Sequence, residues 1–337
     1  MGALIFGKGI FADHLHEIVG CKAGLAVSIE HICDLLTNHG DADKVRSSED
    51  VGLRIRSEDY ESLYYDLLYK VGVTEKPYTG IFAIFDLNRD LAKRHGERFS
   101  ENIFKLYQKW YSTAIEVAVR TGEKLLNPTP VLMEAKKIYG MKGVNAIIEI
   151  MDEYEKMIRF NPHSRNKFSE WRNVLDLDSL FSKYQKNSTY GEYFDQRFID
   201  FLSVNNDKLA TIHWRKFEEL IGECFIKFGY QVEIGPGSND DGVDVRVWSE
   251  KTNCAPKYII QCKKQKDKID KVTVKGLYAD VVAEGAEMGL LVTTSEFSLG
   301  ARKTVDVRGY PIEEVDGKMI GMWLSQLRTP GTGIVRS

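Results

Sequence analysis

The stretch 257-KYIIQCKKQKDKIDKVTVK-275 decides how the last third of this chain folds. A short apolar run ends in Gln261-Cys262-Lys263 and continues in lysines. Side chains of a strand alternate between its two faces, so Gln261 and Lys263 project side by side while Cys262 points toward the core. Two interpretations of the pair follow. Either the two side chains line a polar site, or they form the exposed face of an edge strand, where lysine prevents aggregation.

A second strand is predicted over 243-VDVRVW-248, directly after an Asp-Asp-Gly turn. Its valines alternate on one face, which leaves Asp244 on the other. A carboxylate at the start of a strand, beside an amide and an ammonium on a neighbouring strand, is what metal-assisted phosphodiester cleavage needs. Carboxylate and amide oxygens suit the hard ion Mg²⁺, and an ammonium can orient a water and offset developing charge. Taken alone, an aspartate such as Asp244 is more often a turn or capping residue.

The helix predicted over 214-WRKFEELIGECFIKF-228 supplies a third candidate group. At 100° per residue, Glu218 sits at the edge of the apolar stripe, near the protein body, whereas Glu219 and Glu223 fall on the far side. Glu218 is therefore the acid of this helix that is expected to reach the site. The alternative is a structural ion pair between Glu218 and Arg215 or Lys216.

The periodicity changes near residue 204, which predicts two domains. Before that point the pattern is helical, with helices expected near 23–38, 57–71, 101–126, 142–159 and 190–204. After the polar stretch 204-VNNDKLAT-211, strands are expected at 231–235, 243–248, 257–262 and 288–293, and helices near 270–285, 298–307 and 317–327. The sequence therefore predicts an all-α domain over residues 1–207 and an α/β domain with a mixed central sheet over residues 208–330.

Composition narrows the class of protein. The chain has 337 residues, 43% of them hydrophobic, and a formal net charge of −3. That length is enough for more than one core, and the charge means that any contact with nucleic acid must come from a local patch. The five cysteines show no zinc-like spacing, which favours reduced thiols in a cytoplasmic protein. No apolar stretch approaches the length of a membrane span, so no membrane partner is expected.

Five segments of the second domain resemble the Mrr-type restriction endonucleases, a branch of the PD-(D/E)xK nuclease superfamily. They are 217-FEELIGECFIKFGY-230, 240-DDGVDVRV-247, 259-IIQCKK-264, 289-GLLVTTSEFSLGA-301 and 310-YPIEEVDGKMI-320. The resemblance covers roughly residues 212–327. It implies the restriction-endonuclease-like fold and an active site built from the helical Glu, the second acid of the turn, the Gln and the Lys. In this sequence these are Glu218, Asp244, Gln261 and Lys263.

The resemblance also implies roles for these residues. Asp244, Gln261 and Glu218 would bind Mg²⁺, with Mn²⁺ as the other candidate ion, while Lys263 orients the attacking water. The superfamily more often has an acid where Gln261 stands, and an amide can ligate the ion but adds no charge. Asp240 and Asp241 are alternatives to Asp244 as the metal ligand of the turn, and strand phase favours Asp244.

The activity implied is metal-dependent endonucleolytic cleavage of DNA, in defence against foreign or modified DNA. DNA contacts are expected from lysines that would neutralise phosphates, namely Lys264, Lys266, Lys268 and Lys271, with added hydrogen bonds from Thr293, Thr294 and Ser295. Cutting both strands with one site per chain implies a homo-oligomer. Two alternatives stay open: a nuclease effector activated by a partner protein or signal through residues 1–207, and a DNA-binding scaffold with an inactive nuclease domain.

Overall fold

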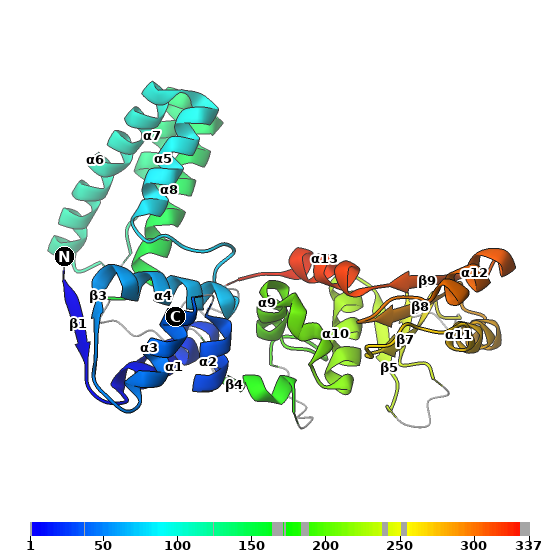
Figure 1. Cartoon of the computed structure of the whole chain (residues 1–337). Helices are drawn as coiled ribbons and strands as arrows, with labels where there is room; N and C mark the ends of the chain where they lie inside the picture. Colours follow the sequence, from blue (N-terminus) through cyan, green and yellow to red (C-terminus); the bar gives the residue numbers. More distant parts are fainter. Residues whose placement is uncertain are drawn as a thin grey trace. The chain divides into compact units, whose positions relative to one another are not determined.

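The computed structural model describes residues 2–36, 38–123, 125–163, 171, 173–182, 189–237, 242–250 and 255–330 (Figure 1). The chain forms two compact units. One comprises Met1–Ser57, Asp66–Pro77 and Phe168–Ser337, and the other comprises Glu58–Tyr65 and Tyr78–Lys167. The predicted domain boundary between residues 207 and 208 stays a prediction. Among the residues that the structure describes, no helix is long and apolar enough to cross a bilayer.

The C-terminal part of the first unit is built on a five-stranded mixed sheet. Its strands follow the order β5 (Gln231–Ile234), β6 (Val245–Trp248), β7 (Tyr258–Lys263), β8 (Met288–Thr293) and β9 (Ile312–Val315). The pairs β5–β6 and β6–β7 are antiparallel, and β7–β8 and β8–β9 are parallel. This confirms the predicted mixed central sheet. Strand β9 was not among the expected strands, because its four residues, Ile-Glu-Glu-Val, do not alternate apolar with polar.

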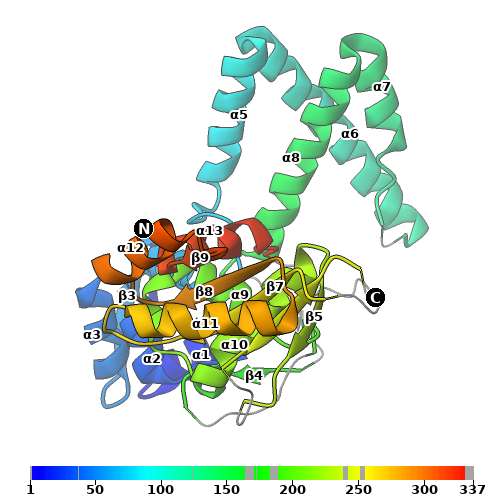
Figure 2. The ribbon, with the colours of Figure 1, turned by 90° about the vertical axis from the view of Figure 1, so that its right-hand side faces the viewer.

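Four helices accompany this sheet: α10 (Trp214–Lys227), α11 (Lys271–Glu284), α12 (Leu299–Arg308) and α13 (Gly317–Leu327). Helix α11 lies across β7, β8 and β9 (Figure 2), and the apolar core beneath it joins strand residues such as Ile259 and Leu291 to Leu277 and Val281 of the helix. Helix α10 packs against β5 and β6. Gly289 of β8 permits the close approach of α11, since a Cβ there would lie 2.9 Å from Val281.

The remainder of the first unit is mainly helical, as predicted. Its helices are α1 (Ile10–Ala23), α2 (Ile29–Leu35), α3 (His39–Ser48) and α9 (Gln196–Val204), with short 3₁₀ turns at Leu177–Leu180 and Asn206–Ala210. Helix α4 (Ser57–Lys70) is divided between the two units, because Glu58–Tyr65 belongs to the second. Four short strands were not predicted: β1 (Ala3–Phe6) pairs with β3 (Leu53–Arg56), and β2 (Leu25–Ala26) with β4 (Leu175–Asp176).

The single helix expected near residues 23–38 is wrong. Gly24 has a left-handed backbone, with φ 65°, and ends α1. The hydroxyl of Ser28 then accepts the backbone N–H of His31 and begins α2. Two residues between these signals pair with β4, so the apolar run that resembled one helix spans a helix end, a strand and a new helix.

The second unit contains the long helices α5 (Phe82–His95), α6 (Glu97–Thr121), α7 (Thr129–Tyr139) and α8 (Met141–Arg159). Its core joins buried residues of all four, among them Leu91, Ile103, Ala135 and Ile147. The rings of Tyr107 and Tyr154 stack at 5.1 Å between centroids. These two rings therefore pack against each other within the unit.

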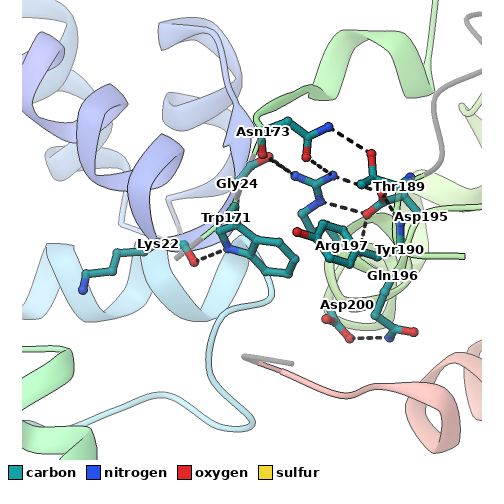
Figure 3. Close-up of polar contacts among 10 residues, drawn as sticks. All are labelled: Lys22, Gly24, Trp171, Asn173, Thr189, Tyr190, Asp195, Gln196, Arg197 and Asp200. Atoms are coloured by element: carbon teal, nitrogen blue, oxygen red, sulfur yellow. Dashed lines mark hydrogen bonds and ion pairs between the residues drawn. The ribbon is translucent and has the colours of Figure 1, made fainter. Parts of the chain in front are cut away.

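A buried arginine ties the N-terminal segment of the first unit to the helix that precedes the sheet (Figure 3). Arg197, at the start of α9, is 2% exposed, and its guanidinium contacts both oxygens of the fully buried Asp195 at 2.8 and 3.0 Å. The same group donates to the carbonyls of Gly24 and Asn173 at 3.0 and 2.8 Å, and to Asn173 Oδ1 at 3.3 Å. These five contacts match the five N–H donors of a guanidinium.

Two aromatic rings also lie close to the Arg197 guanidinium. The Trp171 and Tyr190 rings lie 4.9 and 5.1 Å from the guanidinium carbon, a cation–π geometry. A Cβ on Gly24 would lie 2.5 Å from Trp171 and 2.9 Å from Arg197, so only glycine fits there. Burial alone would raise the pKa of Asp195, but the hydrogen bonds and charge of Arg197 bring that pKa below its usual value.

We expect Arg197→Met to lower the free energy of unfolding of this unit by about 3–5 kcal/mol, because it leaves the buried Asp195 carboxylate without its cation. Arg46→Met is the matched control. The Arg46 side chain is 56% exposed and pairs with Asp43 at 3.6 Å, so its loss should change stability by less than about 1 kcal/mol. Urea unfolding of both variants measures the difference. Equal losses would contradict a structural role for Arg197.

Candidate active site

Strand β7 carries the two polar side chains singled out by the sequence, and both line one surface hollow. Gln261 and Lys263 form the strand side of this hollow, and residues of α11 and its first turn form the other side, including Asp270, Thr273 and Asp280. The register explains the shared face. Arg246 of β6 lies opposite Ile259 and reaches Glu284 of α11 with two contacts at 2.8 and 2.7 Å. The α11 face of the sheet therefore carries Gln261 and Lys263.

Asp244 is attached directly to the backbone of β7. Its Oδ2 accepts the N–H of Cys262 at 2.6 Å, and its own N–H donates to the Ile260 carbonyl at 2.9 Å. The Cys262 nitrogen belongs to the peptide bond that follows Gln261. The carboxylate of Asp244 therefore lies against the Gln-Cys-Lys backbone, as the spacing of the two strands suggested.

Gln261 has a buried oxygen without a partner. The residue is 9% exposed, and among the described residues Oε1 accepts no hydrogen bond. Leaving a buried amide oxygen unpaired costs about 1–3 kcal/mol, which is a reason to expect an external donor or cation. The amide nitrogen sits close to Gly242, where a Cβ would come within 2.9 Å of it and where φ is 89°. Glycine at this turn therefore leaves room for the Gln261 amide.

These groups fit a hard divalent cation in chemistry: a carboxylate from Asp244 and an amide oxygen from Gln261. Within the described ranges, no three His, Cys, Asp or Glu side chains gather closely enough to hold a metal. The candidate set differs from such a cluster because one donor is an amide. The alternative acids Asp240 and Asp241 lie outside the described residues. Lys263 forms no ion pair with any carboxylate of the described residues.

Glu218 reaches this region from a different side. Its Oε2 accepts from Arg215 at 2.8 Å, which is the ion pair weighed as the alternative, and its side chain is 8% exposed. Burial raises the pKa of the Cys262 thiol, and the charges of Asp244 and Glu218 raise it further. Cys262 thus lies near both acids, whereas Glu218 is not among the residues that line the hollow. Its role as a metal ligand stays a prediction.

The far side of α10, where Glu219 and Glu223 were expected, is also buried. Glu219 is 4% exposed and accepts from the buried Lys216 at 2.9 Å. Glu223 is 2% exposed and accepts the N–H groups of Glu192 and Tyr193, both at 2.9 Å. Charged side chains can be buried when such partners satisfy them. A single-helix periodicity cannot show this second layer of contacts.

The lysines expected to contact DNA occupy unlike positions. Lys266 and Lys271 are exposed. Lys268 is 63% exposed and pairs with Glu296 at 2.7 Å, and Lys264 is half-buried with its ammonium 3.5 Å from the Ala210 carbonyl. The loop that holds Lys264, Lys266 and Lys268 is fixed to the loop after β8, since the Ile269 N–H donates to the Glu296 carbonyl and the Ser298 N–H donates to the Ile269 carbonyl, both at 2.9 Å. DNA binding by these lysines stays a prediction.

The threonine at the end of β8 has a structural use. Thr293 is fully buried, and its hydroxyl donates to the Lys263 carbonyl at 2.8 Å and accepts the N–H of Ser295 at 3.0 Å. A phosphate contact from Thr293 is therefore excluded. Thr294 and Ser295 donate to the carbonyls of Gln265 and Lys266 at 3.3 and 3.2 Å. The Thr293 hydroxyl supports the last residue of β7, and the other two support the backbone that follows it.

We expect Thr293→Val to lower the free energy of unfolding by about 1–3 kcal/mol, because it keeps the shape but removes the fully buried hydroxyl that bonds the Ser295 N–H and the Lys263 carbonyl. Thr294→Val is the control, since its hydroxyl is less buried and its bond to Gln265 is longer. Urea unfolding distinguishes them. Equal stabilities for the two variants would show that Thr293 does not hold the end of β7.

Comparison with known proteins places this part of the chain. Residues 209–324 match the family Mrr_cat, described as a restriction endonuclease. An uncharacterized protein y4cE of Sinorhizobium fredii (strain NBRC 101917 / NGR234) is 29% identical over 102 residues, which are 30% of this chain and 26% of that protein. The chain therefore spans about a quarter of the length of this relative.

A solved structure titled "MspJI Restriction Endonuclease in Complex with 27-mer Oligonucleotide" is similar over 47% of this chain and 36% of its own, with 19% identity and a TM-score of 0.26. A similarity at that level supports no detail of the site. The family match covers the same segment as the resemblance noted in the sequence and includes Glu218, Asp244, Gln261 and Lys263. Residues 209–324 of this chain form a restriction endonuclease domain of the Mrr_cat family.

Proposed function

We propose that the chain is a divalent-metal-dependent DNA endonuclease of the Mrr restriction type that acts in defence against foreign or modified DNA. The observation that carries the proposal is the convergence at β7. The carboxylate of Asp244 accepts the Cys262 N–H at 2.6 Å, in the peptide that follows Gln261. Gln261, whose buried Oε1 has no partner among the described residues, and Lys263 line one hollow.

In this proposal Asp244 and Gln261 hold Mg²⁺, or Mn²⁺ in its place, and Glu218 is a third candidate ligand. The ion would polarise the scissile phosphate and acidify a water. Lys263 orients that water for in-line attack and offsets the negative charge that develops on the phosphate. The attack expels the 3′-oxygen and leaves 5′-phosphate ends. Gln261 adds no charge, so Asp244 supplies the carboxylate on which the site depends.

The wider proposal follows from this chemistry. Lys264, Lys266, Lys268 and Lys271 neutralise backbone phosphates, which makes binding dependent on salt and independent of base sequence. A homo-oligomer, at least a dimer, supplies one site for each strand. The reaction takes place where DNA is accessible, in keeping with the cytoplasmic location expected from the sequence.

A second proposal concerns regulation. Arg197 bonds the carbonyl of Gly24, near the N-terminus, and precedes α10 by only 17 residues. A protein or small signal that binds the N-terminal segment can therefore influence the helix that carries Glu218. This supports the alternative in which the nuclease acts as an effector that is silent until a partner arrives.

We expect Asp244→Asn and Lys263→Ala to cut plasmid DNA in Mg²⁺ at least about 10²-fold more slowly than wild type, as is typical when one electrostatic group is removed. Asparagine keeps an oxygen for the Cys262 N–H and removes only the charge. Lys303→Ala, at an exposed position on α12, is the control and should cut at the wild-type rate. Gel electrophoresis of nicked and linear plasmid measures the rates.

Three other outcomes would change the proposal. If both site variants cut like wild type, the active-site assignment is wrong. If wild type cuts only after a partner is added, the effector proposal replaces constitutive restriction. If wild type binds DNA and never cuts, with or without partners and with either ion, the chain is a DNA-binding scaffold with an inactive nuclease domain.

A further inference from the structure

Helix α11 contains a glycine that nothing in the described chain requires. Gly276 is exposed, near the middle of α11, and a Cβ there would meet no atom within 4 Å. Its backbone is not among those with positive φ. Glycine inside a helix costs about 1 kcal/mol relative to alanine, so stability alone favours a side chain at this position.

The position of Gly276 offers a reason for its missing side chain. It lines the same hollow as Gln261 and Lys263, with Thr273 one turn before it and Asp280 one turn after. Gly289 shows the contrast, because its would-be Cβ collides with Val281 and Leu277 and its role is internal packing. Gly276 faces open space instead. Glycine is the residue used where a backbone must approach a ligand closely.

A second, independent feature points to a ligand in this hollow. Gln261 is 91% buried, lines the hollow, and has an Oε1 that accepts no hydrogen bond from the described residues. The wall of this hollow carries a positive charge on its strand side and negative charges on its helix side. Lys263 supplies a cation on the strand side, while the Asp270 carboxylate is occupied by the N–H groups of Val272 and Thr273 at 3.0 and 2.8 Å. Asp280 places a further acid beyond Gly276.

We infer that the sugar–phosphate backbone of the cleaved strand passes over Gly276, and that the missing side chain there admits the strand to Gln261 and Lys263. This inference rests on the proposed nuclease function. The exposed Lys271 and Lys275 lie about 140° and 100° from Gly276 around the helix, so the phosphates proposed to contact Lys271 are not those that pass over Gly276.

The test is a series at one position, Gly276→Ala, Gly276→Leu and Gly276→Phe. Val282→Phe is the matched control, on the same helix, 62% exposed and about 120° from Gly276. Three quantities are measured: the melting temperature, the rate of plasmid cleavage in Mg²⁺, and the affinity for a DNA duplex in Ca²⁺, chosen as an ion for binding without turnover. Lys263→Ala is run in parallel.

We expect the melting temperature to rise for Gly276→Ala, with a small loss of cleavage and affinity. Larger side chains should weaken both progressively, to about 10²-fold slower cleavage for Gly276→Phe, because a displaced scissile phosphate loses its alignment. Val282→Phe should match wild type in cleavage and affinity, and all variants should remain folded.

The inference is overturned if Gly276→Phe cuts and binds DNA as wild type does. If Lys263→Ala is then inactive, the nuclease proposal stands and only the path of the strand is wrong. If Lys263→Ala also cuts normally, the proposed active site itself fails. If wild type shows no cleavage at all, the affinities decide, and equal binding by wild type and Gly276→Phe rejects the inference.

Discussion

The hydrogen bond from the Cys262 N–H to Asp244 Oδ2, 2.6 Å long, is the contact on which the site depends. It joins β6 to β7 where their ladder ends, and a charged acceptor makes such a bond stronger than a neutral one. On the other edge of β7, the Thr293 hydroxyl donates to the Lys263 carbonyl at 2.8 Å. The Gln-Cys-Lys segment is therefore held from both sides, and its side chains keep fixed directions.

The two faces of β7 have opposite characters. On the α11 face, Gln261 leaves a buried oxygen without a partner among the described residues, and Lys263 has no local counter-ion there. On the other face, burial and the nearby acids raise the pKa of Cys262, which favours the protonated thiol. The two polar groups without a partner among the described residues thus lie on the α11 face, where we propose that DNA binds. Cys262, which lies between Gln261 and Lys263 in the sequence, contributes its backbone N–H, which holds the Asp244 carboxylate.

Local periodicity predicted much of the C-terminal domain. Alternation along β6 and β7 was enough to place Gln261 and Lys263 together and Asp244 next to them, because a pleated strand fixes side-chain direction every second residue. Local periodicity did not predict the burial of side chains whose hydrogen-bond partners are distant in the sequence. Glu223 is buried because backbone N–H groups thirty residues earlier bind it, and Thr293 is buried because it supports β7. The role of Arg197 has the same origin, since Gly24 lies 173 positions away.

The central claim is that Asp244 and Gln261 bind a divalent ion beside Lys263. Anomalous X-ray scattering from crystals soaked in Mn²⁺ tests it most directly, because the method locates the ion independently of any activity. We predict one strong peak within coordination distance of an Asp244 carboxylate oxygen and the Gln261 amide oxygen, lost in crystals of Asp244→Asn. Mn²⁺ bound elsewhere in the domain, with none at this position, would contradict the account.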